Sequence, residues 1–194
     1  MAWITGERVV LRAWERDDVR VRWETDQTAD ATEARLRDWH SAPRSLAQRE
    51  AEFDAATEDD ETVVPLVIVA EERVIGDINL FEIDRRNRLA KLGLSIWRAE
   101  DRNRGYGSDA VAALVRWGFR ELNLHRIELS VDPANARAIH VYEKLGFVRE
   151  GVRRDAHFAD GRYTDDLLMG LLDREYEAAQ DARAEERLSE TRDA

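Results

Sequence analysis

The chain of 194 residues contains no cysteine. This absence excludes disulfide bonds, a thiolate nucleophile and any metal site that is built on cysteine ligands. We predict that the protein works without a metal and that it resides in the cytoplasm, where proteins rarely carry disulfides.

Long apolar runs are also missing. None of them approaches the roughly 20 residues that a membrane-spanning helix needs. The first ten residues, MAWITGERVV, lack the basic stretch followed by an apolar one that marks a signal peptide. We therefore expect no membrane partner.

Positive charge is in deficit, because 30 lysines and arginines stand against 41 aspartates and glutamates, for a net charge of −11 at pH 7. The lysines are Lys91 and Lys144 alone. An acidic chain is a poor ligand for nucleic acid, so we expect no such partner. The same charge favours a cationic substrate through electrostatic steering, although solubility alone would account for most of the acidic residues.

The residues that are present predict a single folded domain. Hydrophobic residues make up 43% of the chain, and the length suffices for a sizeable core. Strand patterns occupy Glu7–Trp14, two runs within Val63–Ile83, Leu89–Trp97, Arg126–Val131, and the runs on either side of the turn at Asp160 and Gly161. Helix patterns follow Trp14, span Ser45–Thr57, begin near Gly107, and cover Ala136–Leu145 between Asn135 as N-cap and Gly146 as terminator.

This order of elements predicts an α/β fold with a mixed (α+β) sheet. Residues 26–44 are polar and irregular, and the acidic run Glu58–Glu61 predicts a solvated loop. From Asp173 onward the charge-dense sequence fits either a helix or a frayed end, and a solvated appendage is the default interpretation.

The stretch RNRGYGSDAV, residues 102–111, places glycines and positive charge directly before a helix. The first turn of a helix leaves backbone N–H groups unpaired and carries the positive end of the helix dipole, so it attracts phosphate. Gly105 and Gly107 lack Cβ atoms that would hold a phosphate away, and Arg102 and Arg104 can donate charge-assisted hydrogen bonds. Taken alone, the stretch fits an ordinary glycine-rich turn equally well.

The glycines also match the G-x-G-x-x-A pattern of dinucleotide-binding folds, but their context does not. In those folds the first glycine follows its strand at once, whereas here RAEDRNR intervenes. No further βα units follow Asp132. We therefore do not favour a dinucleotide site.

A second motif, NARAIHVYEKLGF, begins at Asn135. Asn135 and Tyr142 are seven residues apart, which places them on one helix face at a separation of about 10 Å. Taken alone, the tyrosine fits a core position, packed with Ala138 and Leu145, better than a functional one.

Together these motifs resemble the GNAT family of N-acetyltransferases. RNRGYGS resembles its R/Q-x-x-G-x-G/A loop, NARAIHVYEKLGF its N-x-x-A-x-x-x-Y-x-x-x-G-F segment, and DGRYTDDLLMGLL the closing hairpin of its RimJ/RimL-like and spermidine N-acetyltransferase-like branch. The resemblance runs over residues 7–172 and implies a mostly antiparallel central sheet, flanked by helices, in which two strands splay apart. In the family, the strand that corresponds to Leu89–Trp97 carries a bulge. Residues 173–194 then form a charged C-terminal tail.

The resemblance also implies a site for acetyl-CoA and a role for each matched residue. The pyrophosphate would bind at Arg102, Asn103, Arg104, Gly105, Tyr106, Gly107 and Ser108. The pantetheine arm would lie between Ser95, Ile96 and Trp97 on one side and Asn135, Ala136 and Arg137 on the other. Tyr142 would stand beside the thioester sulfur.

The implied chemistry is direct attack of an amine on the thioester in a ternary complex. A phenol of ordinary pKa near 10 is protonated at pH 7, so Tyr142 can donate a proton to the departing thiolate. The amine must first lose a proton. Relatives often carry an acidic residue where this chain has Lys91, so we predict Glu82 as the base, ahead of His125, His157 and Asp84.

The acceptor is expected to be a polyamine-like small molecule or a protein N-terminus, and a small amine or an amino-sugar antibiotic fits equally well. The branch implies a homodimer. The segment Leu36–Arg44, LRDWHSAPR, is not acidic enough to identify a polyamine site. A non-catalytic module that binds acyl-CoA with the same fold is the alternative function. Release of CoA in the presence of amines distinguishes it from an enzyme.

Overall fold

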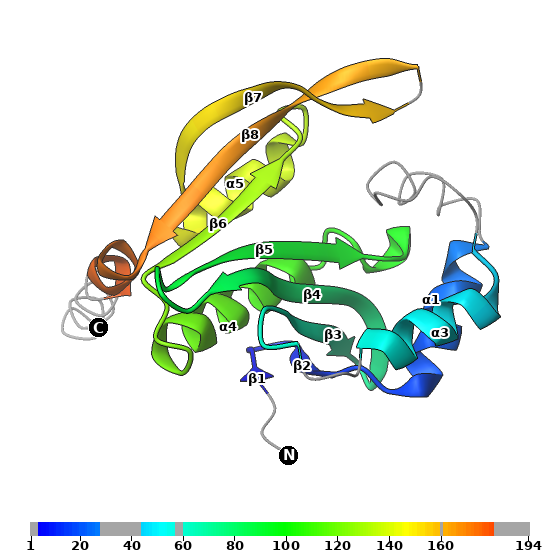
Figure 1. The fold of residues 1–194 in the computed structure, drawn as a ribbon. Helices are drawn as coiled ribbons and strands as arrows, with labels where there is room; N and C mark the ends of the chain where they lie inside the picture. The colour runs from blue at the N-terminus through cyan, green and yellow to red at the C-terminus, as the bar shows by residue number, and fades with distance from the viewer. Residues whose placement is uncertain (1–3, 28–43, 57–59, 160, 181–194) are drawn as a thin grey trace, which may run out of the picture.

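The computed structural model describes residues 4–27, 44–56, 60–159 and 161–180. The strands of these residues form one eight-stranded sheet in the order β1-β2-β3-β4-β5-β6-β8-β7 (Figure 1). They are β1 (Ile4–Thr5), β2 (Val10–Ala13), β3 (Val64–Ala70), β4 (Arg73–Asp84), β5 (Leu89–Ile96), β6 (Arg126–Val131), β7 (Val148–Ala159) and β8 (Arg162–Leu172). Neighbouring strands are antiparallel except β5 and β6, which are parallel. The predicted mixed α/β fold is confirmed.

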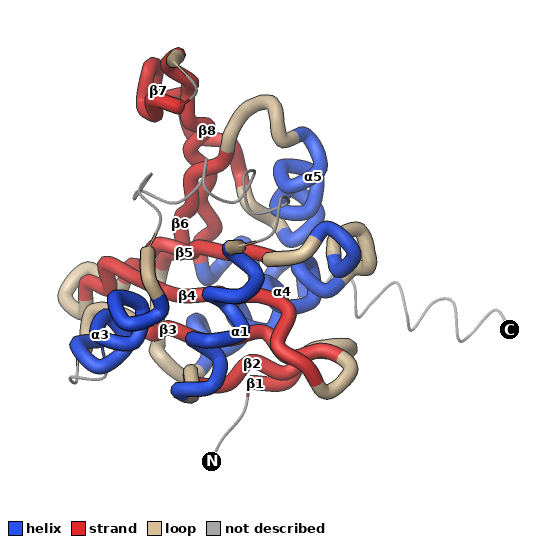
Figure 2. The backbone as a smooth tube through the Cα atoms, turned by 90° about the vertical axis from the view of Figure 1, so that its right-hand side faces the viewer, coloured by secondary structure: helices blue, strands red, loops and turns tan. Residues whose placement is uncertain are grey.

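Helices cover both faces of the sheet. α4 (Tyr106–Arg120) and α5 (Ala136–Leu145) lie on one face, which we call the α4 face (Figure 2). α1 (Arg16–Asp26) and α3 (Leu46–Ala56) lie on the other, the α1 face. The main core fills the space between the sheet and α4, where the predicted apolar stripe of that helix is buried at Val111, Leu114, Val115 and Gly118.

The parallel pair β5 and β6 separates after three residues. Leu89–Lys91 pair with Arg126–Glu128, and beyond them the two strands diverge (Figure 1). β4 remains paired with β5 as far as Ile96, and β8 with β6 as far as Val131. The predicted splayed pair is thus confirmed, and we call the space between its strands the wedge, closed at Lys91 and open toward Ile96.

The resemblance implied a bulge in β5, but the structure has the bulge in β4. The register of β4 and β5 shifts between Phe81 and Asp84, so Glu82 and Ile83 of β4 oppose Ala90 alone on β5. Glu82 adopts a positive φ of 50° to accommodate the extra residue. The extra residue therefore lies near the C-terminal end of β4, just before the β4–β5 turn, and β5 itself contains no extra residue.

The predicted strand Glu7–Trp14 is wrong at its beginning, because the chain turns at Gly6 and starts β2 at Val10. The carboxylate of Asp109 in α4 accepts hydrogen bonds from the N–H groups of Glu7 (2.9 Å), Arg8 (2.7 Å) and Val9 (3.0 Å). This long-range cap fixes the turn against the first turn of α4. No local pattern in Glu7–Trp14 indicates it.

The start of the predicted tail also differs from a solvated appendage. Residues 173–180 are helical, and Tyr176 is buried with its ring 5.3 Å from that of Phe119. Most of the irregular stretch 26–44, part of the acidic loop, Asp160 and residues 181–194 lie outside the described residues. No described helix is long and apolar enough to cross a membrane.

Candidate active site

The loop before α4 has the geometry of an anion site. Gly105 is the N-cap of the helix and adopts a left-handed φ of 83°, which a glycine tolerates without strain. The N–H of Asp109 donates to the Gly105 carbonyl at 3.1 Å. This is the first hydrogen bond of the helix. The N–H groups of Tyr106, Gly107 and Ser108 come before it, in the first turn, where N–H groups have no acceptor within the helix. They supply the donors and the dipole end that a phosphate requires.

The loop is fixed to the end of β5. Arg102 donates from Nε to the Ile96 carbonyl (3.2 Å) and from a terminal nitrogen to the Trp97 carbonyl (3.3 Å). The indole N–H of Trp97 donates to Asp77 at 2.5 Å, and its backbone N–H donates to Ile75 at 3.0 Å. The structure thus uses the backbone and the ring of Trp97 to build the framework of the site.

A second set of contacts, which the sequence analysis missed, holds the loop to the β3–β4 turn. Arg73 forms a two-pronged ion pair with Asp101, whose side chain is buried, and one of its hydrogen bonds measures 2.9 Å. Asp101 raises the pKa of Arg73 through these hydrogen bonds. The hydroxyl of Tyr106 donates to Glu71 at 2.6 Å, which lowers the pKa of Glu71 and raises that of Tyr106. The partners are about 30 residues apart, so no local pattern reveals them.

The start of α5 lies beside the same loop. Arg137 donates to the side-chain oxygen of Asn103, which links α5 to the loop before α4. Asn135 caps α5 by accepting from the N–H of Ala138 at 3.1 Å, and Ala136 begins the helix. The structure therefore brings the two predicted halves of the cofactor site together.

Tyr142 lies two turns further along α5 and is 9% exposed. Its ring packs edge-on against Phe147, with 5.8 Å between the ring centroids. The core alternative is therefore correct for the ring. This packing holds the ring in place, and the role of its hydroxyl as a proton donor stays a prediction.

Glu82 lies at the closed end of the wedge. It is 60% exposed and forms an ion pair with Lys91, with 2.5 Å between Oε2 and Nζ. Ser95 is four residues beyond Lys91 along β5, which is about 13 Å at the usual rise of a strand. Its assignment as the base stays a prediction.

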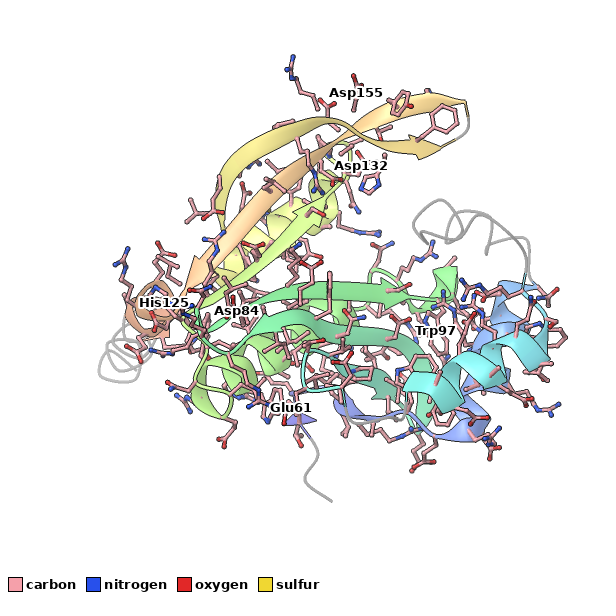
Figure 3. The ribbon with its side chains drawn as sticks, viewed as in Figure 1. Glu61, Asp84, Trp97, His125, Asp132 and Asp155 are labelled. Carbon is pink, nitrogen blue, oxygen red and sulfur yellow. The ribbon has the colours of Figure 1, made fainter. Side chains whose placement is uncertain are left out.

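Two weaker candidates for the base also lie near the closed end (Figure 3). Asp84 accepts from the backbone N–H of Asn87 at 2.8 Å and from its side chain at 2.6 Å, and these bonds lower its pKa. His125 lies 3.1 Å from Asp173. Asp84 therefore stabilises the β4–β5 turn, whereas His125 connects the start of β6 to the segment that follows β8.

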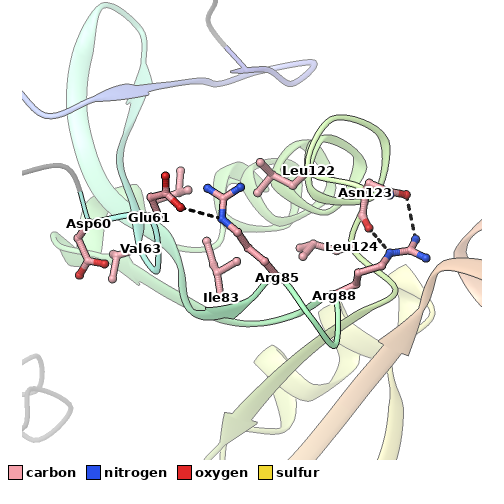
Figure 4. Close-up of a pocket in the computed structure, with 10 residues that line it drawn as sticks. Asp60, Glu61, Val63, Ile83, Arg85, Arg88, Leu122, Asn123 and Leu124 are labelled. Atoms are coloured by element: carbon pink, nitrogen blue, oxygen red, sulfur yellow. Dashed lines mark hydrogen bonds and ion pairs between the residues drawn. The ribbon is translucent and has the colours of Figure 1, made fainter.

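A pocket of about 500 Å³ lies between the β4–β5 turn and the C-terminal end of α4 (Figure 4). An ion pair of 3.2 Å between Arg85 and Glu61 borders it, and Arg88 donates to the Asn123 carbonyl at 2.6 Å. None of the predicted site residues lines this pocket. In the described part of the chain, no group of acidic or histidine side chains could hold a metal ion.

Comparison with known proteins agrees with this geometry. Residues 8–148 match a family model described as an acetyltransferase (GNAT) domain. The spermidine N(1)-acetyltransferase of Escherichia coli K12 is 28% identical over 89% of this chain and 90% of its own. An uncharacterized N-acetyltransferase, p20, of Bacillus licheniformis is 35% identical over 63% of this chain and 68% of its own. A solved structure of spermidine N-acetyltransferase from Vibrio cholerae, in complex with CoA and spermine, superposes with a TM-score of 0.77 at 28% identity, over 88% of this chain and 99% of that one.

Proposed function

The chain belongs to the GNAT acetyltransferase family and is an acetyl-CoA-dependent N-acetyltransferase, and we propose that its acceptor is a primary amine of a polyamine. The observation that carries the proposal is the wedge, which opens toward the first turn of α4, where the N–H groups that precede the first helical hydrogen bond would hold the pyrophosphate. Relatives that match about nine tenths of the chain are named for spermidine. The net charge of −11 favours a polycationic acceptor.

The residues of the wedge fit acetyl-CoA. Gly107 lies beside the open end of β5, because a Cβ built there would contact Leu94 (3.4 Å) and Ile96 (3.8 Å) at ordinary van der Waals distances. Residues 102–108 would hold the pyrophosphate, and Ser95, Ile96 and the start of α5 would border the pantetheine arm. When bound, acetyl-CoA supplies a thioester carbonyl for the amine to attack. We propose that Tyr142 gives its proton to the sulfur as the carbon–sulfur bond breaks.

A panel of amines tests the substrate class. We expect CoA release to be faster with spermidine and spermine than with a monoamine or a peptide that has a free N-terminus. A thiol reagent reports this directly, because the protein contains no cysteine that would add a background. Faster release with the peptide would assign the enzyme to protein N-termini instead.

We further propose that the enzyme works as a homodimer in the cytoplasm and that β7 forms the contact. β7 is an edge strand, and it exposes Val148 (52%), Val152 (54%) and Phe158 (65%). An unpaired edge with apolar side chains is a surface on which a second copy can add.

Light scattering is expected to give twice the mass of one chain for the parent and the mass of one chain for Val152→Asp. Cutting the chain after residue 180 should leave the dimer unchanged. This cut tests the tail better than one after Leu172, which would also remove buried Tyr176. A monomer that appears only after the cut would place the contact in the tail.

A further inference from the structure

The β7–β8 hairpin contains a buried carboxylate that the roles described above do not use. Asp166 of β8 is 2% exposed. It accepts a hydrogen bond of 2.6 Å from Arg153 and lies 2.8 Å from Nε2 of His157. The His157 side chain is 40% exposed, so the ring reaches from a buried partner to the surface.

An irregularity in β7 creates this arrangement. The register shifts between Arg153 and His157, so residues 154–156 of β7 oppose Asp165 alone on β8. Asp155 takes a positive φ of 51°, and its N–H donates to Asp165 at 2.9 Å. The extra residues allow Arg153 and His157 to contact the same carboxylate. Irregularities of this kind commonly redirect a side chain near a functional site.

The pair lies on the β6-β8-β7 side of the sheet, across the wedge from β5, and it begins one residue beyond Leu167, where the pairing of β8 with β6 ends. At the closed end of the wedge, Arg126 of β6 pairs with both Leu89 of β5 and Leu172 of β8. Ser95 is six residues beyond Leu89 along β5, and Asp166 is six residues before Leu172 along β8. Ser95 and Asp166 therefore stand at the same level along the sheet. Figure 3 shows the two walls at this level, with Trp97 at the end of β5 and Asp132 at the end of β6.

Asp166 also belongs to the face that an acceptor would approach. Leu167, Met169 and Leu171 of β8 are buried in the core, so Asp166 and Leu168 alternate onto the α1 face. The loop before α4, proposed to hold the pyrophosphate, lies on the other face. A pantetheine arm of acetyl-CoA that passes from the α4 face through the wedge would bring its acyl end to the α1 face, at the level of Ser95 and Asp166.

We propose that His157, oriented by Asp166, is the base that takes the proton from the acceptor amine. The proton moves from the ammonium nitrogen to the imidazole, and the lone pair that it frees forms the bond to the thioester carbon. The carbon–sulfur bond then breaks, and the sulfur takes the proton of Tyr142. The second proton that the nitrogen loses as it becomes an amide returns Tyr142 to its phenol form, and the imidazolium releases its proton to solvent. Asp166 stabilises the imidazolium through its charge and hydrogen bond. This step rests on the proposed function, and it assigns the base to His157 in place of Glu82, whose carboxylate already pairs with Lys91.

His157→Gln is expected to lower kcat/KM about 10²–10⁴-fold and to remove the acidic limb of its pH profile, which reports the base of the free enzyme. Asp166 contacts His157 directly, and Arg153 pairs with the same carboxylate, so both charges act on this position. His140→Gln, at an exposed position on α5, is the matched control and should keep the parent profile. Acetyl-CoA affinity measured by calorimetry should be unchanged in both variants.

Two further variants separate a chemical role from a structural one. His157→Ala should regain activity when imidazole is added, whereas a folding defect would not respond to it. Asp166→Asn should show an intermediate loss and a displaced acidic limb, as expected for a positioning residue.

The proposal is overturned if His157→Gln keeps the parent rate and its acidic limb, or if Glu82→Gln loses that limb instead. The profiles are measured on whichever amine of the panel is turned over fastest. Failure of the polyamine proposal therefore leaves the test of His157 intact.

Discussion

Tyr142→Phe is expected to turn over its amine about 10²–10⁴ times more slowly than the parent enzyme, the usual contribution of a positioned proton donor. The substitution removes only the hydroxyl. The ring, its 9% exposure and its contact with Phe147 at 5.8 Å are preserved, so folding should change little. Acetyl-CoA affinity should also be retained, because the phenol is proposed to serve the departing thiolate and not the bound thioester.

Tyr176→Phe is the matched control for this prediction. Tyr176 is 8% exposed and packs against Phe119 with 5.3 Å between the ring centroids, so it resembles Tyr142 in burial and ring contact. It lies in the helical residues after β8, away from the wedge. Turnover is measured by thiol release and folding by thermal unfolding. Equal turnover in both variants would remove Tyr142 from the mechanism and leave it a core residue.

Local sequence patterns predicted the elements that form the cofactor side of the site. Asn135 caps α5 and Gly146 ends it with a φ of 105°, as their residue types indicated. The apolar spacing of α4 predicted its buried stripe, and the glycines marked its first turn. These features depend on interactions within one or two helical turns, so their residues stand close together in the sequence.

The features that were missed depend on contacts between distant segments. Asp109 caps a turn that lies 100–102 positions away in the sequence, and Asp101 pairs with Arg73 across 28 positions. His157 and Asp166 are nearer in sequence, but only the shifted register of β7 brings them together. A bulge changes which face a side chain occupies, so an alternating pattern cannot predict the neighbours of residues beyond it.

The resemblance to a family supplied what local patterns could not, namely the use of each segment. It implied the splayed strands, which the pairing of β5 and β6 confirms. It implied less about the base, because Lys91 occupies a position that is often acidic in relatives. Lys91 forms an ion pair with Glu82, the carboxylate that the sequence analysis favoured. The residue that accepts the proton of the amine must therefore be identified by experiments on this chain.

Gly107→Val is expected to weaken acetyl-CoA binding by about 10²–10⁴-fold while the fold is retained. A charge-assisted hydrogen bond contributes about 1.5–3 kcal/mol, and a side chain over the first turn of α4 would deny the phosphate two of its N–H donors. The loss of about 3–6 kcal/mol corresponds to this range of affinity. Gly107 is a better test than Gly105, whose φ of 83° would strain any larger residue whatever the ligand does.

The protein itself has room for a Cβ at position 107, because the nearest atoms would be at ordinary contact distances of 3.4 Å and 3.8 Å. Gly107→Ala should therefore fold and bind with an intermediate affinity. Ala112→Val adds the same β-branched side chain to α4 beyond its first turn, so it controls for the helix propensity of valine, which costs about 0.5 kcal/mol. Calorimetry measures the affinity of all three variants. A folded Gly107→Val protein that binds acetyl-CoA as tightly as Ala112→Val would show that the pyrophosphate lies elsewhere than on the first turn of α4.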